Sequence, residues 1–324
     1  MLITLKEILT LAETGGYAIG AYNTPNLASL MAVLESAEKL NVPVMFQHAQ
    51  LHEEIMPIKV IGPIMVMMAE RAAVPVCVQL DHGEDLDYIK IALELGFTAV
   101  MYDGSKLPYN ENVESTQKAV ELARSYSASV EAELGMMTGH KAGAGEPSEP
   151  SACASQLNHS NKNAKHSYNT SLATLCASAD VGCTPGTAMY TDPIEAGQFV
   201  RSTNIDALAC SFGTAHGFYT ETPKLEFERI SAISKETGIP LVMHGGSGVS
   251  PDDYGKCIRR GVRKINYYSY MSRAGVEGIR TFLADEDVQH THDIFTRVAR
   301  SMAENVEWSM RIFYTNALTT ERRI

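Results

Sequence analysis

Three histidines stand at or just beyond the ends of short apolar runs. Histidine side chains bind metals and transfer protons, so these positions are the first candidates for chemistry. They are His82, His216 and His244. Three imidazoles with a fourth position left open form the ligand set typical of a catalytic zinc ion. The three are remote in the chain, and no HExxH-type motif accompanies them. The spacing therefore predicts a metal centre only if the fold brings these positions together; otherwise each is an ordinary core or surface histidine.

An aspartate stands directly before the first of these histidines. Asp81 is a candidate proton donor or acceptor beside a metal, and its alternative role is to orient a ligand histidine. Adjacent strand residues point to opposite faces. We therefore expect the strand to have ended before Gly83, which lets Asp81 and His82 reach the same site. Other polar side chains stand at or near the ends of apolar runs elsewhere: Asn23, Gln47, Asp103, Glu131, Glu133 and Asn266.

A glycine-rich stretch, HGGSG at 244–248, predicts a phosphate site. Ser250 and Pro251 follow it as the N-cap and first residue of a helix. Backbone N–H groups of such a loop and of a helix start suit a phosphate, although a simple tight turn is the alternative. Downstream, Asn266 and Ser269 follow the last apolar run and reinforce the phosphate interpretation.

The elements that must position these residues alternate along the chain. Helix-type apolar spacing is clearest at 27–40, 111–125, 193–202 and 225–237. The β-type runs are 17–23, 42–47, 74–82, 97–103, 127–134, 206–210, 240–244 and 264–266. Eight βα units predict an α/β fold, a closed (β/α)8 TIM barrel, with a doubly wound open sheet as the structural alternative. In a barrel the polar positions above share the carboxyl end, where such folds assemble their active sites.

One stretch interrupts the alternation. Residues 136–189 are rich in Ser, Ala, Gly and Asn and show little periodicity. We expect a flexible insertion there, forming an enlarged loop after the fifth strand. The whole chain, 1–324, is predicted to be one barrel domain, with a C-terminal helical extension at about 286–324.

Composition and charge limit the partners. The chain has 324 residues, 45% hydrophobic and 20% charged, as in an ordinary globular protein. Its formal charge of −11 disfavours nucleic acid and anionic membrane surfaces. Six cysteines without a CxxC pair fit reduced thiols. No secretory leader or membrane span is predicted, so we expect a soluble, cytoplasmic protein.

Taken in order, these motifs resemble the zinc-dependent class II ketose-bisphosphate aldolases, which include fructose- and tagatose-bisphosphate aldolases. The resemblance spans roughly 1–135 and 190–285. It depends on eight ordered motifs: GAYN (20–23), QLDHG (79–83), VMYDGS (100–105), VEAELG (130–135), YTDPIEAGQF (190–199), GTAHGFY (213–219), LVMHGGSGV (241–249) and KIN (264–266).

The resemblance implies a lyase of carbohydrate metabolism, as in glycolysis, acting on a phosphorylated sugar. His82, His216 and His244 would hold one catalytic zinc, and Asp103 and Glu133 a second or alternative metal position. Asp81 would be the catalytic acid/base. Some family members also use a monovalent cation, and association into homodimers or homotetramers is implied. Residues expected to hold dihydroxyacetone phosphate or line its site are Asn23, Gly217, Gly245, Gly246, Ser247, Asn266 and Ser269.

The implied reaction is reversible cleavage of a phosphorylated ketose to dihydroxyacetone phosphate and an aldehyde through a metal-stabilised enediolate. Zinc on the carbonyl would stabilise the carbanion. No Schiff-base lysine is then required, and Lys264 is the only lysine in the apolar runs that carry the site.

Two departures from the family concern the substrate. The loop after the fifth strand normally reads LGG followed by acidic residues, one of which removes the C3 proton; here Glu146 and Glu149 are candidates without clear alignment. A serine that binds the far phosphate of bisphosphate substrates is replaced by His-Ala-Gln at 48–50. The proton-abstracting base and the aldehyde partner therefore stay open.

Two further departures lie near the C-terminus. Tyr267 and Tyr268 replace small or acidic residues of the family, and candidate phosphate arginines are Arg280, Arg311 and Arg322. Two alternatives to the leading hypothesis remain. One is an aldolase for a deoxy sugar acid phosphate, and the other is a non-catalytic barrel subunit that keeps the phosphate site.

Overall fold

The computed structural model describes most of the chain. The described residues are 1–135, 190–285, 287–315 and 318. The predicted insertion at 136–189, with Glu146 and Glu149, lies outside them, as does Arg322.

Eight parallel strands close into a barrel in chain order, β1 next to β2 and so on until β8 returns to β1. The predicted (β/α)8 fold is confirmed, and the open doubly wound sheet is excluded by the β1–β8 pairing. Each predicted run contains or overlaps one strand. The strands are β1 Ile19–Asn23, β2 Val44–Ala49, β3 Val76–Gly83, β4 Ala99–Tyr102, β5 Ser129–Leu134, β6 Ala207–Cys210, β7 Leu241–Met243 and β8 Val262–Asn266.

The strands are apolar because helices or the barrel interior cover both of their faces. Along β2, Val44 and Phe46 are fully buried on the outward-facing register, whereas Gln47 points inward. The inward positions near the carboxyl ends are polar, and those residues build the site described below.

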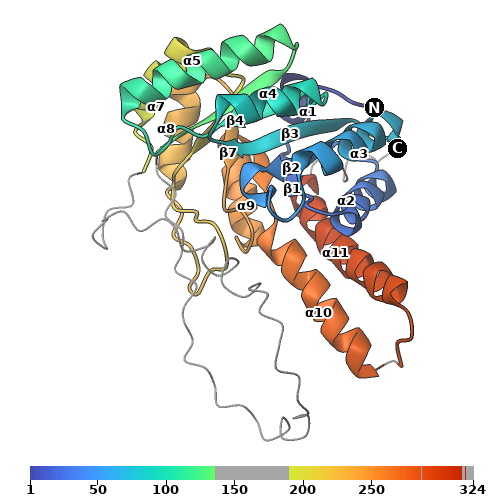
Figure 1. Ribbon diagram of the computed structural model, residues 1–324. Helices are drawn as coiled ribbons and strands as arrows, with labels where there is room; N and C mark the ends of the chain where they lie inside the picture. The colour runs from blue at the N-terminus through green and yellow to red at the C-terminus, as the bar shows by residue number, and fades with distance from the viewer. Residues whose placement is uncertain (136–189, 286, 316–317, 319–324) are drawn as a thin grey trace, which may run out of the picture.

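Helices follow most strands and cover the outside of the barrel (Figure 1). The four predicted helices are confirmed to within two residues at each end. Asn26, Asp192 and Ser250 accept backbone N–H hydrogen bonds as N-caps, the last as predicted. The helices are α1 Leu5–Gly15, α2 Leu27–Leu40, α3 Ile58–Arg71, α4 Leu86–Glu94, α5 Tyr109–Ser125, α7 Pro193–Thr203, α8 Phe227–Thr237, α9 Pro251–Ile258, α10 Ser269–Asp285 and α11 Thr291–Phe313, with a 3-10 turn η1 at Gln50–His52.

Helix α1 closes the amino end of the barrel. Thr4 and Glu7 form a reciprocal capping box at its start. Its buried face, Leu5, Ile8 and Leu9, packs toward strands β1, β3, β5 and β8. The amino end is thereby plugged by apolar side chains, which leaves the carboxyl end as the place for polar chemistry.

Helices α10 and α11 form a pair that extends from the barrel beside α2 (Figure 1). Beyond α11, the Tyr314 hydroxyl accepts a hydrogen bond from the Gly20 N–H at 3.0 Å and donates to the Pro43 carbonyl at 2.5 Å. The chain after α11 is thus tied to the strands β1 and β2. Within the described part of the chain, none of the helices combines the length and apolar character needed to cross a membrane.

Candidate active site

A β-bulge brings Asp81 and His82 to one site. Strand β3 continues to Gly83, so the expectation that it ends earlier is wrong. Instead its register against β4 shifts between Leu80 and Gly83, and His82 has a positive φ of 46°. The bulge removes the strict alternation of side chains, which allows adjacent residues to share the barrel mouth.

The three histidines meet at this mouth. Their ligand nitrogens all lie within 4.8 Å of one another. The ring centroids of His82 and His244 are 4.6 Å apart, and those of His82 and His216 are 5.1 Å apart. His244 is buried and His216 is exposed at the rim. The fold therefore satisfies the geometric condition that the sequence alone left open.

Carboxylates hold two of these imidazoles by their outer nitrogens. His82 Nδ1 lies 2.8 Å from Asp103 Oδ2, and His244 Nε2 lies 2.9 Å from Glu131 Oε1. Because a carboxylate only accepts, each of these nitrogens carries the hydrogen. That leaves His82 Nε2 and His244 Nδ1 as the nitrogens that could bind a metal, and they lie 2.9 Å apart. This is the carboxylate–histidine arrangement that orients metal ligands.

A second group of possible ligands comprises His82, Asp103 and Glu133. Burial raises the pKa of Glu133 well above its usual value, and the nearby Asp103 carboxylate adds to the rise. Glu133 Oε2 is buried, has no hydrogen-bond partner within the described part of the chain, and lies 3.9 Å from His244 Nδ1. Burial opposes protonation of His82, yet Asp81 and Asp103 raise its pKa to about 10.

These features fit a divalent metal. The carboxylates around His82 favour a cationic ring, and a buried oxygen of Glu133 has no hydrogen-bond partner among the described residues, so a metal cation would satisfy both. The donor set of nitrogens and a carboxylate suits zinc. The residues present therefore match the ion that the resemblance implies.

Three amides hold the Asp81 carboxylate. Asn23 donates to Oδ2 at 2.8 Å, while Gln47 and Asn266 donate to Oδ1 at 3.2 and 3.0 Å. Burial opposes its ionisation, but the nearby His82, His244 and Lys264 and the Asn23 hydrogen bond hold its pKa below the usual range. Asp81 is thus an ionised, oriented carboxylate beside the histidines.

A buried hydrogen-bond chain joins Asp81 to the metal ligands. Gln47 Nε2 donates to Gln79 Oε1 at 3.0 Å, and Gln79 Nε2 donates to Glu131 Oε2 at 2.9 Å. Lys264 Nζ also donates to Glu131 Oε2, at 2.7 Å, and both residues are fully buried. The resulting charge pairing lowers the pKa of Glu131 to about 2, although burial opposes this.

The sequence assigns no role to the residues of this hydrogen-bond network. Gln47 and Glu131 were noted as polar strand residues, and Lys264 only as a lysine near the site. The available signal was a polar or charged residue inside an apolar run. At Glu131 and Glu133, the spacing of two placed both carboxylates on the same face of β5.

The glycine-rich loop lies between the ends of β6, β7 and β8. Gly245 has φ 62°, and a Cβ there would overlap the Ala215 carbonyl, so only glycine fits. The Gly246 N–H donates to the Asn266 carbonyl at 3.2 Å, which ties this loop to β8. Gly246 therefore shapes the loop and does not offer a free N–H. Ser247 Oγ accepts from the Tyr268 N–H at 3.0 Å.

The remaining predicted substrate residues lie around this loop. Ser269 is the first residue of α10, whose N-terminal N–H groups suit an anion. Asn266 contacts Asp81, and Gly217 is exposed next to His216 with φ 99°. Of the candidate phosphate arginines, Arg280 pairs with Glu277 on α10 and Arg311 pairs with Glu307 on α11.

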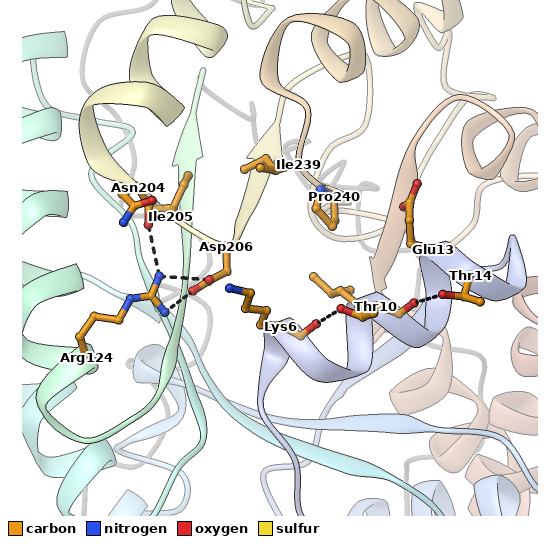
Figure 2. Close-up of a pocket in the computed structure, with 11 residues that line it drawn as sticks. Lys6, Thr10, Glu13, Thr14, Arg124, Asn204, Ile205, Asp206, Ile239 and Pro240 are labelled. Carbon is orange, nitrogen blue, oxygen red and sulfur yellow. Dashed lines mark hydrogen bonds and ion pairs between the residues drawn. The ribbon is translucent and has the colours of Figure 1, made fainter.

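A cavity with a volume of about 720 Å³ lies at the opposite end of the barrel. It is lined by α1 and by the segments that lead into β6 and β7 (Figure 2). Two of its charged groups are paired, because Arg124 contacts Asp206 at 3.0 Å, and Glu13 pairs with Arg263 outside the lining. Among the described residues, none of the predicted site residues lines it.

Comparisons with known proteins agree with this site. The family model for class II fructose-bisphosphate aldolase matches residues 3–317. The chain is 32% identical to a 6-phospho-5-dehydro-2-deoxy-D-gluconate aldolase of Halalkalibacterium halodurans, covering 99% of both chains. It is also 32% identical to a fructose-bisphosphate aldolase of Staphylococcus epidermidis, covering 97% of this chain and 98% of the relative.

A solved structure, the YdjI aldolase from Escherichia coli K12, superposes with a TM-score of 0.77 at 26% identity over 97% of each chain. The matched family is generally zinc-dependent and acts on phosphorylated sugars. The chain belongs to the class II fructose-bisphosphate aldolase family and is an aldehyde lyase.

Proposed function

We propose that this protein cleaves a phosphorylated ketose reversibly between C3 and C4, giving dihydroxyacetone phosphate and an aldehyde. The observation that carries the proposal is the convergence of three histidines on Asp81 at the barrel mouth. The glycine-rich loop, with Ser247 in it and Ser269 nearby, also supports the proposal, because it suits the phosphate of the ketone half.

The metal would be held by His82, His216 and His244, with Glu133 as a further candidate ligand. When bound, zinc supplies Lewis acidity that stabilises negative charge next to the ketone. Asp103 and Glu131 contact His82 Nδ1 and His244 Nε2 and would leave the other nitrogen of each ring available to such an ion. A second metal and a monovalent cation are further expectations from the resemblance.

Asp81 would move the proton at the C4 hydroxyl. In cleavage its carboxylate accepts that proton as the C4 oxygen becomes the aldehyde carbonyl, and the C3–C4 electron pair stays on C3. In condensation the same proton returns to the aldehyde oxygen. Asn23, Gln47 and Asn266 fix its carboxylate in place, so the base needs no reorientation.

The ketone half of the substrate is better supported than the aldehyde half. Fructose-bisphosphate and 6-phospho-5-dehydro-2-deoxy-D-gluconate, which the relatives' names specify, both yield dihydroxyacetone phosphate on cleavage next to the ketone. Fructose or tagatose 1,6-bisphosphate is the reference substrate, and a deoxy sugar acid phosphate is the second candidate. A non-catalytic role is less consistent with an ionised Asp81 held by three amides.

We also propose that the protein acts in the cytoplasm as a homodimer or homotetramer. The resemblance to the family is the reason for expecting this assembly. Light scattering on the purified protein tests the assembly, and a monomer at micromolar concentration would contradict it.

Cleavage is tested by mixing zinc-loaded protein with each candidate ketose phosphate and measuring dihydroxyacetone phosphate by enzymatic reduction. We expect release that stops with a chelator and returns with zinc. His244→Ala should be inactive, whereas His292→Ala, which removes an exposed histidine on α11, should match the unmodified protein. Equal activity in both variants would refute the proposal.

A further inference from the structure

The loop between β6 and α8 carries the one histidine of the metal centre that no carboxylate of the described structure orients. Asp103 holds His82, and Glu131 holds His244. The ring centroid of His216 lies 5.1 and 5.8 Å from those of these two histidines, but none of the described carboxylates forms a hydrogen bond or ion pair with it. The place of His216 beside the other two ligands therefore depends on its backbone.

The backbone around His216 has little support of its own. Residues 213–218 form no backbone–backbone hydrogen bond with any described residue. The Glu226 N–H donates to the Phe212 carbonyl at 2.9 Å, which closes only the base of the loop. A segment with so few backbone hydrogen bonds needs side-chain contacts to hold one conformation.

The Tyr219 hydroxyl supplies two such contacts. It accepts a hydrogen bond from the Ala215 N–H at 2.8 Å and donates one to the Gly245 carbonyl at 2.9 Å. Ala215 directly precedes His216, and Gly245 directly follows His244. One phenol oxygen thus joins the two backbone segments that carry these ligands, and it does so beyond the ends of both β6 and β7.

The two segments are in direct contact at this bridge. A Cβ on Gly245 would overlap the Ala215 carbonyl oxygen, so the backbones approach each other as closely as they do because glycine stands there. Both Ala215 and Gly245 are buried, and Tyr219 is half-buried. A buried N–H or carbonyl without a partner costs free energy, which favours the hydroxyl in its bridging position.

Tyrosine suits this bridge because its ring is stiff and its hydroxyl can accept and donate at the same time. The side chain reaches back over four residues, from position 219 to the N–H of Ala215, and so closes the short turn that presents His216. Phenylalanine would fill the same space and form neither hydrogen bond. The motif GTAHGFY at 213–219 includes Tyr219, and the reaction described above assigns it no role.

From this arrangement we infer that Tyr219 is a positioning residue for the metal. Its hydroxyl sets the separation of the two backbone segments so that His216 and His244 both face one ion, and Tyr219 itself binds neither the ion nor the substrate. The inference rests on the proposed function, because it concerns the metal centre that the proposed cleavage requires.

Zinc affinity in Tyr219→Phe tests the inference. It is measured on the purified full-length protein by competition with a chelator whose absorption changes when it binds zinc. We expect the dissociation constant to rise by about 10- to 100-fold, the effect of losing an outer partner of a ligand histidine. An unchanged dissociation constant, with zinc bound by the unmodified protein, would overturn the inference and leave the proposed cleavage intact.

Tyr314→Phe is the matched control, because the Tyr314 hydroxyl makes the same pair of contacts at the other end of the barrel. It accepts from the Gly20 N–H at 3.0 Å and donates to the Pro43 carbonyl at 2.5 Å. Tyr314 is fully buried, so its variant should lose at least as much stability as Tyr219→Phe in urea unfolding of the zinc-free protein. Its zinc affinity should not change. An equal loss of affinity in both variants would show that Tyr219 merely supports the fold and would contradict its assigned role.

Cobalt(II) in place of zinc reports the geometry of the site directly, because its visible absorption depends on the number and arrangement of its ligands. We expect the unmodified protein and Tyr314→Phe to share one spectrum and Tyr219→Phe to give a different one. The same spectrum in all three would overturn the inference. If the unmodified protein bound neither metal and released no dihydroxyacetone phosphate from any ketose phosphate, the proposed function would be refuted, and this inference with it.

Discussion

The two ends of the barrel differ in whether their polar groups have hydrogen-bond or ion-pair partners. At the amino end there is a cavity of about 720 Å³, and two of the ionic groups that line it, Arg124 and Asp206, are paired with each other. At the carboxyl end, ionisable groups are buried, crowded and incompletely satisfied, as Glu133 Oε2 is. Buried groups without partners are costly.

The comparison shows that buried groups without partners, and not the presence of a cavity, identify the functional end here. A pair of opposite charges near solvent contributes little to the free energy of unfolding. Two buried histidine nitrogens that face each other, or a buried carboxylate oxygen without a donor, are tolerated where a bound ligand interacts with them. Variants matched across the two ends can therefore break or sharpen the comparison.

The largest effect is expected from removing a metal ligand. His216→Ala leaves two histidines and should reduce zinc affinity by more than the roughly 100-fold that loss of an outer partner costs. Zinc content after dialysis and lyase activity measure this. Lys6→Ala, at the amino-end cavity, should leave both unchanged, and equal losses in the two variants would abolish the distinction between the ends.

Removing the acid/base should rank next. Asp81→Asn keeps the shape but cannot accept the C4 hydroxyl proton, and we expect cleavage to slow by roughly 10²- to 10⁴-fold. Zinc content should stay at the level of the unmodified protein. Asp206→Asn is the matched change at the amino end; if it slowed cleavage as much, Asp81 would have no special role.

Breaking the buried ion pair should affect stability. Lys264→Met leaves Glu131 buried without its cation, and such losses cost about 3–5 kcal/mol. Urea unfolding of the zinc-free protein measures this without contribution from the metal. A destabilisation below about 1 kcal/mol would show that the pair contributes little.

Acid should weaken the same contact. The pKa of Glu131 is lowered to about 2 in the folded protein, so its carboxylate contributes stability above its ordinary pKa, near 4.5. That contribution is lost as pH falls from about 4.5 toward 2. In Glu131→Gln this part of the acid sensitivity should be absent, and an unchanged stability profile between pH 5 and 3 would contradict the assignment.

The smallest effect is expected at the exposed amino-end pair. Arg124→Ala removes a contact of 3.0 Å in which the arginine is 40% exposed. Exposed pairs contribute about 0–1 kcal/mol. Urea unfolding should change by no more than this, and kcat/KM should not change; a large loss of activity would mean that the amino-end cavity takes part in function.

Much of the fold could be predicted from the sequence because the local patterns and the tertiary structure agree. The apolar runs give all eight strands, and Ser250 with Pro251 gives the start of α9. The convergence of His82, His216 and His244 followed once a closed barrel was assumed, since strand ends share one face.

The features that could not be predicted from the sequence depend on contacts between residues that are remote in the chain. The bulge at His82 depends on pairing with β4, and the Lys264–Glu131 contact joins residues 133 positions apart. His48 belongs to the His-Ala-Gln departure from the family motif at 48–50; burial lowers its pKa to about 4, which no local pattern reveals.

The most direct test of the central claim is proton exchange at C3 of dihydroxyacetone phosphate in heavy water, followed by NMR. It requires the metal centre and the phosphate loop but no aldehyde. We predict exchange with zinc-loaded protein, loss of exchange with a chelator, and recovery when zinc is restored. No exchange by protein that holds zinc at the three histidines would contradict the account and favour a non-catalytic barrel.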